Sequence, residues 1–241
     1  MIKIINLRKD FGNLVVLDDV SVDIPEGETL AVIGPSGCGK STLLRLILGL
    51  EKPTSGQIMI DSMDVAKSSD AGLIKIRQKI GMVFQSSALF DSLSVFENVA
   101  FPLREHTKKS EREIERIVSQ KLELVELAGK GDLFPSELSG GMQKRVSIAR
   151  ALAFDPKIIL YDEPTTGLDP ITSTTIENLI NKLAAGLKVI SIIVTHQLST
   201  IFRTAHRIIM LDQGKFIESG TVEETKRSKN PVVYRFISAG Q

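Results

Sequence analysis

Residues 34–42 read GPSGCGKST, a run of closely spaced glycines followed at once by lysine, serine and threonine. An apolar run at 29–33 precedes it and predicts a buried strand, and the apolar spacing of LLRLIL at 43–48 is typical of a helix with one buried face. Glycine lets the backbone turn tightly enough to aim several N–H groups at one phosphate, and the N-terminal end of the next helix adds positive charge. Because strand, loop and helix are in register, we interpret the stretch as a phosphate-binding loop rather than a chance glycine-rich turn.

The side chains of this loop have separate expected roles. Lys40 would reach the β- and γ-phosphates of a nucleoside triphosphate, and the Ser41 hydroxyl would ligate Mg²⁺. Cys38 is the one cysteine of the chain, which excludes an internal disulfide and fits a reducing compartment. Its thiol could block nucleotide binding when alkylated, but we favour a small residue that the loop tolerates. The expected nucleotide contacts are Gly34, Pro35, Ser36, Gly37, Cys38, Gly39, Lys40, Ser41 and Thr42.

Composition limits the possible partners. The chain has 241 residues, of which 42% are hydrophobic, and its 30 basic and 29 acidic side chains give a net charge of +1. This balance predicts neither a nucleic-acid groove nor a polybasic membrane tether. There is no apolar run of the roughly 18–20 residues that span a bilayer, and the N-terminus does not have the pattern of a signal peptide. We therefore expect a cytosolic protein whose role at a membrane depends on partners.

The order of predicted elements indicates an α/β fold. Short β-rich runs fill the first 85 residues, the pattern between about 86 and 154 is helical, and strands then alternate with helices. This alternation predicts a mainly parallel sheet covered on both faces, with the helical middle inserted as a smaller lobe. The predicted strands are 2–7, 20–24, 29–33, 57–60, 80–84, 158–162, 189–195, 207–211 and 215–218; the predicted helices are 110–128, 142–154, 172–185 and 198–204; and 65–71 and 223–230 are expected to be polar loops.

Two adjacent carboxylates follow the predicted strand at 158–162. At the C-terminal end of a strand in an α/β sheet, side chains point into the ligand crevice, and neighbouring residues face opposite ways. Asp162 would hold the Mg²⁺ shell, and Glu163 would polarise the attacking water as a general base. The alternative, a solvated acidic turn before Pro164, is disfavoured by the phosphate loop upstream.

Further polar residues stand where a γ-phosphate could lie. Gln85 and His196 each follow a predicted buried strand, although either could be an ordinary loop residue. The stretch LSGGM at 138–142 precedes a predicted helix, and two glycines at a helix N-terminus can form an anion-binding nest. TTGLD at 165–169 follows the two carboxylates.

In this order and spacing, the motifs resemble the nucleotide-binding subunit of ABC transporters over almost the whole chain. The resemblance implies a P-loop NTPase fold: a RecA-like core with an antiparallel β subdomain (1–85 and 155–222), an inserted α-helical subdomain (86–154) and a tail (223–241), together forming a single domain at 1–241. It assigns Walker A to 34–42, the Q-loop to Gln85, the signature to 138–142, Walker B to 158–163, the D-loop to 164–169 and the switch histidine to His196.

The resemblance also implies functions for individual residues. The catalytic residues would be Glu163, His196, Gln85 and Lys40. Mg²⁺ would be held by Ser41, Gln85 and Asp162. ATP would further contact Ser139, Gly140, Gly141 and Asp169, with Phe11 where the family keeps an aromatic that stacks on adenine. The signature departs from the commoner LSGGQ in having Met142, but Ser139 and the glycine amides can still contact phosphate, so we expect ATP binding to survive.

In this family ATP lies between the Walker A loop of one subunit and the signature of a second copy. The sequence offers no candidate arginine finger, so the charge on the transferred phosphoryl group must be balanced by Lys40, Mg²⁺ and the dipole of the signature helix. The resemblance therefore implies a homodimer that closes on ATP and opens after hydrolysis.

A narrower likeness concerns the cargo. FQSSALFDSLSVFENVAFPLREHT at 84–107, with LSGGM and DEPTTGLDPIT, looks like the Mla/Mce-type ATPases that power phospholipid movement between membranes. It implies two copies of an MlaE-like permease at the inner membrane, an MCE-domain protein and a possible STAS-domain protein. The apolar residues at 85–103 could form the core of the helical lobe or a groove for a membrane subunit, and the tail at 231–241 could grip a neighbour or cap the chain's own sheet.

Other classes remain as alternatives. A non-transport ABC ATPase of DNA repair, translation or cluster assembly is disfavoured because the chain has one nucleotide domain, no long heptad insertion and no basic stripe. A module that binds ATP without turnover is disfavoured because Lys40, Asp162, Glu163 and His196 are all present. Import of another solute, lipoprotein release and service to a division complex stay open within the transporters.

Overall fold

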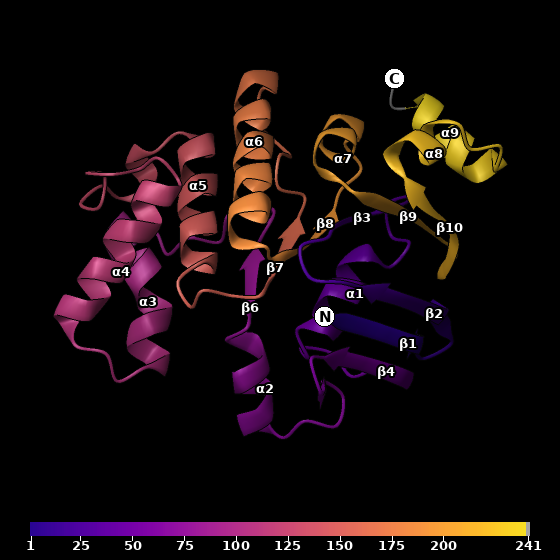
Figure 1. Cartoon of the computed structure of the whole chain (residues 1–241), viewed down its shortest axis with the longest axis horizontal. Coiled ribbons are helices and arrows are strands. Elements are labelled where there is room, and N and C mark those ends of the chain that lie inside the picture. Colours follow the sequence, from indigo (N-terminus) through magenta and orange to yellow (C-terminus); the bar gives the residue numbers. More distant parts are fainter. Residues whose placement is uncertain (240–241) are drawn as a thin grey trace.

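The computed structural model describes residues 1–239 and contains two β-sheets with helices packed around them (Figure 1). The smaller sheet is antiparallel, with strand order β2-β1-β4-β5, and the larger has the order β10-β9-β3-β8-β7-β6. Strands β9, β3, β8, β7 and β6 run parallel, and only β10 pairs antiparallel at its edge. The predicted α/β fold with a mainly parallel core sheet is confirmed.

The elements have the following bounds. The strands are β1 Ile2–Phe11, β2 Leu14–Ile24, β3 Thr29–Ile33, β4 Ser55–Ile60, β5 Met63–Asp64, β6 Ile80–Val83, β7 Ile158–Asp162, β8 Ile190–Val194, β9 Arg207–Asp212 and β10 Lys215–Thr221. The helices are α1 Lys40–Ile47, α2 Asp70–Arg77, α3 Val95–His106, α4 Glu111–Leu124, α5 Gly140–Ala151, α6 Pro170–Leu187, α7 Leu198–Thr204, α8 Val222–Lys226 and α9 Pro231–Ala239, with a 3-10 turn at Pro135–Glu137.

Burial explains why the central strands could be recognised from the sequence. All five residues of β3 and of β8 are buried, as expected for parallel strands covered on both faces. The predicted bounds of β3, β7 and α7 agree with the structure. Two large hydrophobic clusters fill the space on the two sides of the parallel sheet, one including α1 and the small sheet and the other including α3, α4, α5 and α6.

Two segments expected to be loops overlap short helices, at residues 70–71 and at residues 223–226. Helix α2 begins at Asp70 because the Ser69 hydroxyl accepts a hydrogen bond from the Gly72 N–H at 3.3 Å. Helix α8 begins after Thr221, whose side chain and that of Glu224 form a capping box. In both cases a side-chain cap stabilises the first turn; α8 has the polar composition of a loop, whereas α2 is polar at its start and carries apolar residues at 73, 74 and 76.

The C-terminal helices lie on the opposite side of the molecule from α3 and α4 (Figure 1). In α9, Val233 and Ile237 are buried in a cluster with residues of β3, β9 and α7. Helix α9 therefore caps the chain's own sheet with these two residues, while Tyr234 is 65% exposed; residues 240–241 of the predicted tail lie outside the described residues. No helix within residues 1–239 is both long enough and apolar enough to cross a membrane.

Candidate nucleotide site

The glycine-rich loop connects β3 to α1 at the C-terminal edge of the parallel sheet. Gly34 has a φ of +152°, and a Cβ there would lie 2.1 Å from the backbone oxygen of Leu211, so only glycine fits at this position. The Lys40 ammonium donates to the carbonyl oxygens of Gly34 and Pro35 at 2.8 and 2.9 Å, and its side chain is almost fully buried. The loop thus holds a cation where a phosphate can accept hydrogen bonds from it.

The loop, the two carboxylates and Gln85 surround one cavity of about 300 Å³. Its lining residues are Val16, Ser36, Gly37, Gly39, Lys40, Ser41, Thr42, Gln85, Asp162, Glu163 and Val194. The structure therefore brings together the phosphate loop, Walker B and the Q-loop residue, which are far apart in the sequence.

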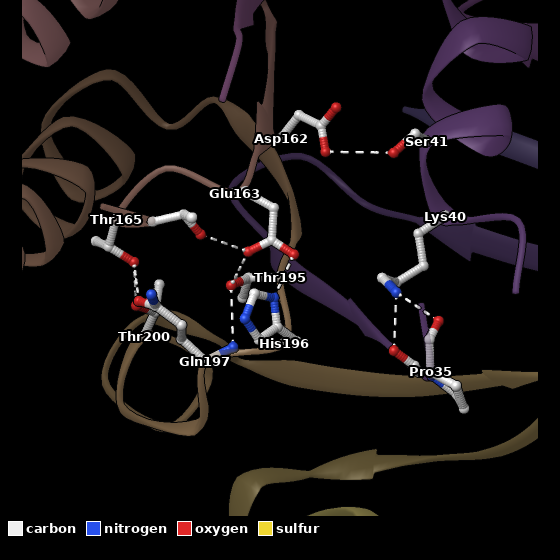
Figure 2. Close-up of polar contacts among 12 residues, drawn as sticks. Pro35, Lys40, Ser41, Asp162, Glu163, Thr165, Thr195, His196, Gln197 and Thr200 are labelled. Atoms are coloured by element: carbon white, nitrogen blue, oxygen red, sulfur yellow. Dashed lines mark hydrogen bonds and ion pairs between the residues drawn. The ribbon is translucent and has the colours of Figure 1, made fainter. Parts of the chain in front are cut away.

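Asp162 and Ser41 are placed to share a small cation. The Ser41 hydroxyl donates to Asp162 Oδ1 at 3.5 Å, and burial, followed by the neighbouring Glu163 carboxylate, raises the pKa of Asp162 (Figure 2). No group of three His, Cys, Asp or Glu side chains in residues 1–239 is arranged to hold a metal. These oxygens fit Mg²⁺, which proteins usually bind through one or two carboxylates while phosphate and water complete its shell.

Glu163 is held in place by three neighbouring side chains. Its φ of +48° lies in the left-handed region, where a residue with a Cβ persists only if its surroundings hold it. The hydroxyls of Thr195 and Thr166 donate to Oε2 at 2.8 and 3.0 Å, and His196 Nδ1 lies 2.8 Å from Oε1 (Figure 2). The carboxylate is therefore oriented from both sides, as a general base requires.

Gln85 is fixed by a residue that the sequence analysis did not single out. The ammonium of Lys144 on α5 donates to the backbone oxygens of Phe84 and Gln85 at 2.9 and 2.8 Å. Lys144 is 2% exposed, and burial lowers its pKa to about 8. Arg150 on the same helix donates to the carbonyls of Ser87 and Ala88 at 2.9 and 2.7 Å. Two cations of α5 therefore hold the main chain that follows β6.

The signature residues lie outside this cavity, at the start of α5. Ser139 caps the helix by accepting from the Met142 N–H at 3.3 Å, and Ser139 and Gly140 are exposed. A Cβ on Gly141 would lie 2.4 Å from Thr172 Cγ2, so this glycine permits close packing of α5 on α6. Asp169 caps α6 by accepting from the N–H groups of Ile171 and Thr172, both at 3.0 Å. In one chain, then, the signature and the phosphate loop are separate.

Phe11 likewise stands apart from the residues that line the cavity. It ends β1, is 45% exposed, and the ammonium of Lys9 lies 4.5 Å from its ring centroid. Its role toward adenine stays a prediction.

We expect Cys38 to react slowly with alkylating agents. Burial raises the pKa of its thiol, and the nearby Lys40 ammonium does not overcome this effect, so little reactive thiolate exists at neutral pH. Iodoacetamide at pH 7 should modify the folded chain at least about 10-fold more slowly than the urea-unfolded chain. Mass spectrometry over time measures both rates, and equal rates would contradict the expectation.

Comparisons with known proteins agree with this geometry. A family profile described as "ABC transporter" matches residues 17–166. The intermembrane phospholipid transport system ATP-binding protein MlaF of Haemophilus influenzae is 42% identical over 98% of this chain and 90% of its own length. The methionine import ATP-binding protein MetN of the same species is 43% identical over 93% of this chain and 66% of its own length.

Solved structures show the same fold. One is the dimeric structure of the ATP-binding cassette MJ0796 in a post-hydrolysis state, bound to ADP and Pi. It superposes on this chain with a TM-score of 0.83 and is 38% identical to it. The match covers 92% of this chain and 99% of that chain. The sequence, the fold and the arrangement of the motifs therefore agree, and the chain belongs to the ATP-hydrolysing, ATP-binding subunits of ABC transporters.

Proposed function

We propose that two copies of this chain close around two ATP molecules and, by hydrolysing them, drive an inner-membrane permease that moves phospholipid. The dimer is proposed because Ser139 and Gly140 are exposed and do not line the cavity that contains Lys40 and Glu163. The N-terminus of α5 presents backbone N–H groups and a positive dipole, which are suited to the γ-phosphate. A second copy can therefore supply what each cavity lacks.

Within the cavity each residue has a proposed part in hydrolysis. Lys40 and the loop N–H groups bind the β- and γ-phosphates. Ser41, Gln85 and Asp162 would hold Mg²⁺, which would neutralise charge on those phosphates. Glu163 takes a proton from the attacking water, and His196 orients Glu163 from the side of Oε1. Because Glu163 Oε2 already accepts from Thr195 and Thr166, Oε1 is the oxygen with more freedom to face water.

The site for the permease is proposed on the helical side of the molecule. A groove of about 430 Å³ is lined by Ile74, Arg77, Gln78, Ile80, Gly81, Met82, Phe84, Ala88, Phe90, Phe101, Pro102, His106, Arg150, Ala151 and Phe154. Phe90 and Phe101 are 44% and 39% exposed, with ring centroids 4.8 Å apart, whereas Val95 and Val99 of the same apolar segment are fully buried. Val95 and Val99 therefore belong to the core of the helical lobe, and the proposed groove uses Phe90 and Phe101. An exposed aromatic groove suits an amphipathic helix of a membrane subunit.

The main-chain segment 84–88 connects the groove to the nucleotide cavity. Phe84 and Ala88 line it, and the carbonyls of these residues are the ones that Lys144 and Arg150 hold. A helix that enters the groove would therefore press on the segment that carries Gln85. Through this contact a movement of the permease would reach Gln85, and the chain would be held at the cytoplasmic face of the membrane.

We expect Phe90→Ser and Phe101→Ser to weaken permease binding, each by at least about 10-fold, because burying a phenylalanine contributes about 1.5–3 kcal/mol. ATP binding by the isolated chain should stay within twofold, since neither ring lines the nucleotide cavity. Leu187→Ser, at a side chain of similar exposure (43%) at the end of α6, is the matched control. Pull-down with detergent-solubilised permease measures the effect, and equal losses in all three variants would argue against the groove.

Support for phospholipid as cargo comes from the likeness to MlaF, which extends over 90% of that protein. The methionine import protein MetN has a similar sequence identity to this chain (43%), so identity alone does not distinguish the cargo and a separate experiment is needed. Purification of the tagged chain from detergent-solubilised membranes should recover a polytopic permease and an MCE-domain protein, with or without a STAS-domain protein. Recovery of a nutrient-type substrate-binding protein instead would overturn the proposal of lipid transport and leave the ATPase assignment intact.

A further inference from the structure

Glu177 is a buried carboxylate that the proposed mechanism does not use. It lies on α6, and only 1% of its side chain is exposed. Its Oε1 accepts a hydrogen bond from the Thr200 hydroxyl of α7 at 2.8 Å, and its Oε2 lies 3.5 Å from Arg203 Nε. Taking a carboxylate out of water is unfavourable, and these partners offset that cost only in part. An apolar side chain would serve packing better, which indicates another role for Glu177.

The contact continues from Glu177 toward the site. Thr200 Oγ1 lies 2.7 Å from Thr165 Oγ1, and the Thr165 hydroxyl lies 2.6 Å from Gln197 Oε1 (Figure 2). Thr165 and Thr200 are both fully buried. Glu177, Thr200, Thr165 and the partly exposed Gln197 therefore form a continuous series of polar contacts, which we call the Glu177 chain.

Both loops that the Glu177 chain reaches carry groups that hold Glu163. Thr165 is followed by Thr166, whose hydroxyl donates to Glu163 Oε2. Gln197 follows His196, and its backbone N–H donates to Thr195 Oγ1 at 3.1 Å. Thr195, His196 and Thr166 are the three residues that orient Glu163, and each adjoins or bonds to a member of the chain.

We propose that Glu177, acting through Thr200, is a positioning residue for the carboxylate of Glu163. Through these contacts it holds the loop after β7 and the loop after β8 together. Thr166, Thr195 and His196 then keep their positions around Glu163. The inference rests on the general-base role proposed for Glu163. The inference adds Glu177, a buried residue in the middle of α6, as a residue on which the geometry of the general base depends.

The physical reason is that a general base works only within hydrogen-bond reach of its proton, and a misplacement of about 1 Å can cost about 10²-fold in rate. Glu163 has a left-handed backbone, which its own conformational preference does not maintain. Loss of the Thr200 hydroxyl would leave Glu177 and Thr165 without a shared partner and free the two loops to shift. ATP binding depends on the phosphate loop, which the Glu177 chain does not contact.

The test uses the full chain, assembled with its permease where turnover requires it. Thr200→Val removes the hydroxyl at nearly constant shape, and Glu177→Leu fills the same space without a carboxylate. We expect each to lower kcat for ATP at least about 10-fold, with KM within twofold, and the double variant to be no worse than either single one. Thr200→Ser, which restores the hydroxyl, should return kcat to within about threefold of the unmodified chain.

Asn181→Ala is the matched control, because Asn181 Nδ2 donates to the Arg203 carbonyl at 3.0 Å and also joins α6 to α7, outside the Glu177 chain. Its kcat should stay within twofold. A Thr200→Val protein with normal kcat, or an equal fall in Asn181→Ala, would overturn the inference. The two proposals fail separately: a fast Glu163→Gln variant refutes the role of Glu163, whereas an inactive Glu163→Gln beside a normal Thr200→Val refutes only the positioning.

Discussion

Replacing Glu163 with glutamine is expected to lower the rate of ATP hydrolysis by about 10²–10⁴-fold, the usual contribution of a general base. An amide keeps the size of the side chain and can still accept from Thr195 and Thr166, but it does not take a proton from water. ATP should bind normally and hold two copies together, because the step that removes the γ-phosphate is blocked. Phosphate release measures the rate, and sedimentation with Mg·ATP measures the mass.

The control for this variant is Glu115→Gln, at an exposed residue of α4 outside the site. It removes the same charge and should leave turnover unchanged. Hydrolysis by Glu163→Gln at a rate near that of the unmodified chain would show that another group activates the water.

Replacing Lys40 with alanine is expected to weaken ATP binding by at least about 100-fold. The buried ammonium is placed at the phosphate loop, where two charge-assisted hydrogen bonds to phosphate would each contribute about 1.5–3 kcal/mol. Calorimetric titration with Mg·ATP and with Mg·ADP measures the loss, and the triphosphate should lose more because Lys40 reaches the γ-phosphate.

Lys52→Ala, at an exposed lysine beyond α1, provides the comparison. Its affinity for ATP should stay within twofold, since a distant surface charge is screened by salt. An equal loss in both variants would mean that general positive charge, rather than the loop ammonium, binds the nucleotide.

The sequence was sufficient for the parts of the site that depend on local chemistry. The loop at 34–42 needs glycine at sterically closed positions such as Gly34, and lysine must follow directly, so the pattern is visible in the chain itself. Strand β7 is a mainly apolar run that ends at Asp162, so the sequence itself places Asp162 and Glu163 at the edge of the sheet.

Contacts across long sequence separations could not be predicted in the same way. Lys144 and Glu177 lie on helices among other polar residues, where a charged side chain is usually solvated, and only the packing of α5 and α6 shows that both are buried. The hydrogen bonds of Thr195 and Thr166 to Glu163 depend on how two loops meet. Helix α2 was missed because its capped first turn is polar and contains Gly72.

The central claim is that each nucleotide site needs two chains, and mixed dimers test it directly. On the Glu163→Gln background, one tagged chain carries Lys40→Ala, and a second, differently tagged chain carries Ser139→Asp, which keeps the cap of α5 but adds negative charge toward phosphate. Ser139→Asn, which keeps the cap without the charge, is the control. Each mutant homodimer lacks every complete site, whereas a mixed dimer has one intact loop facing one intact signature. The account predicts one Mg·ATP retained per mixed dimer after gel filtration and none per homodimer, while mixed dimers that form but retain none would contradict it.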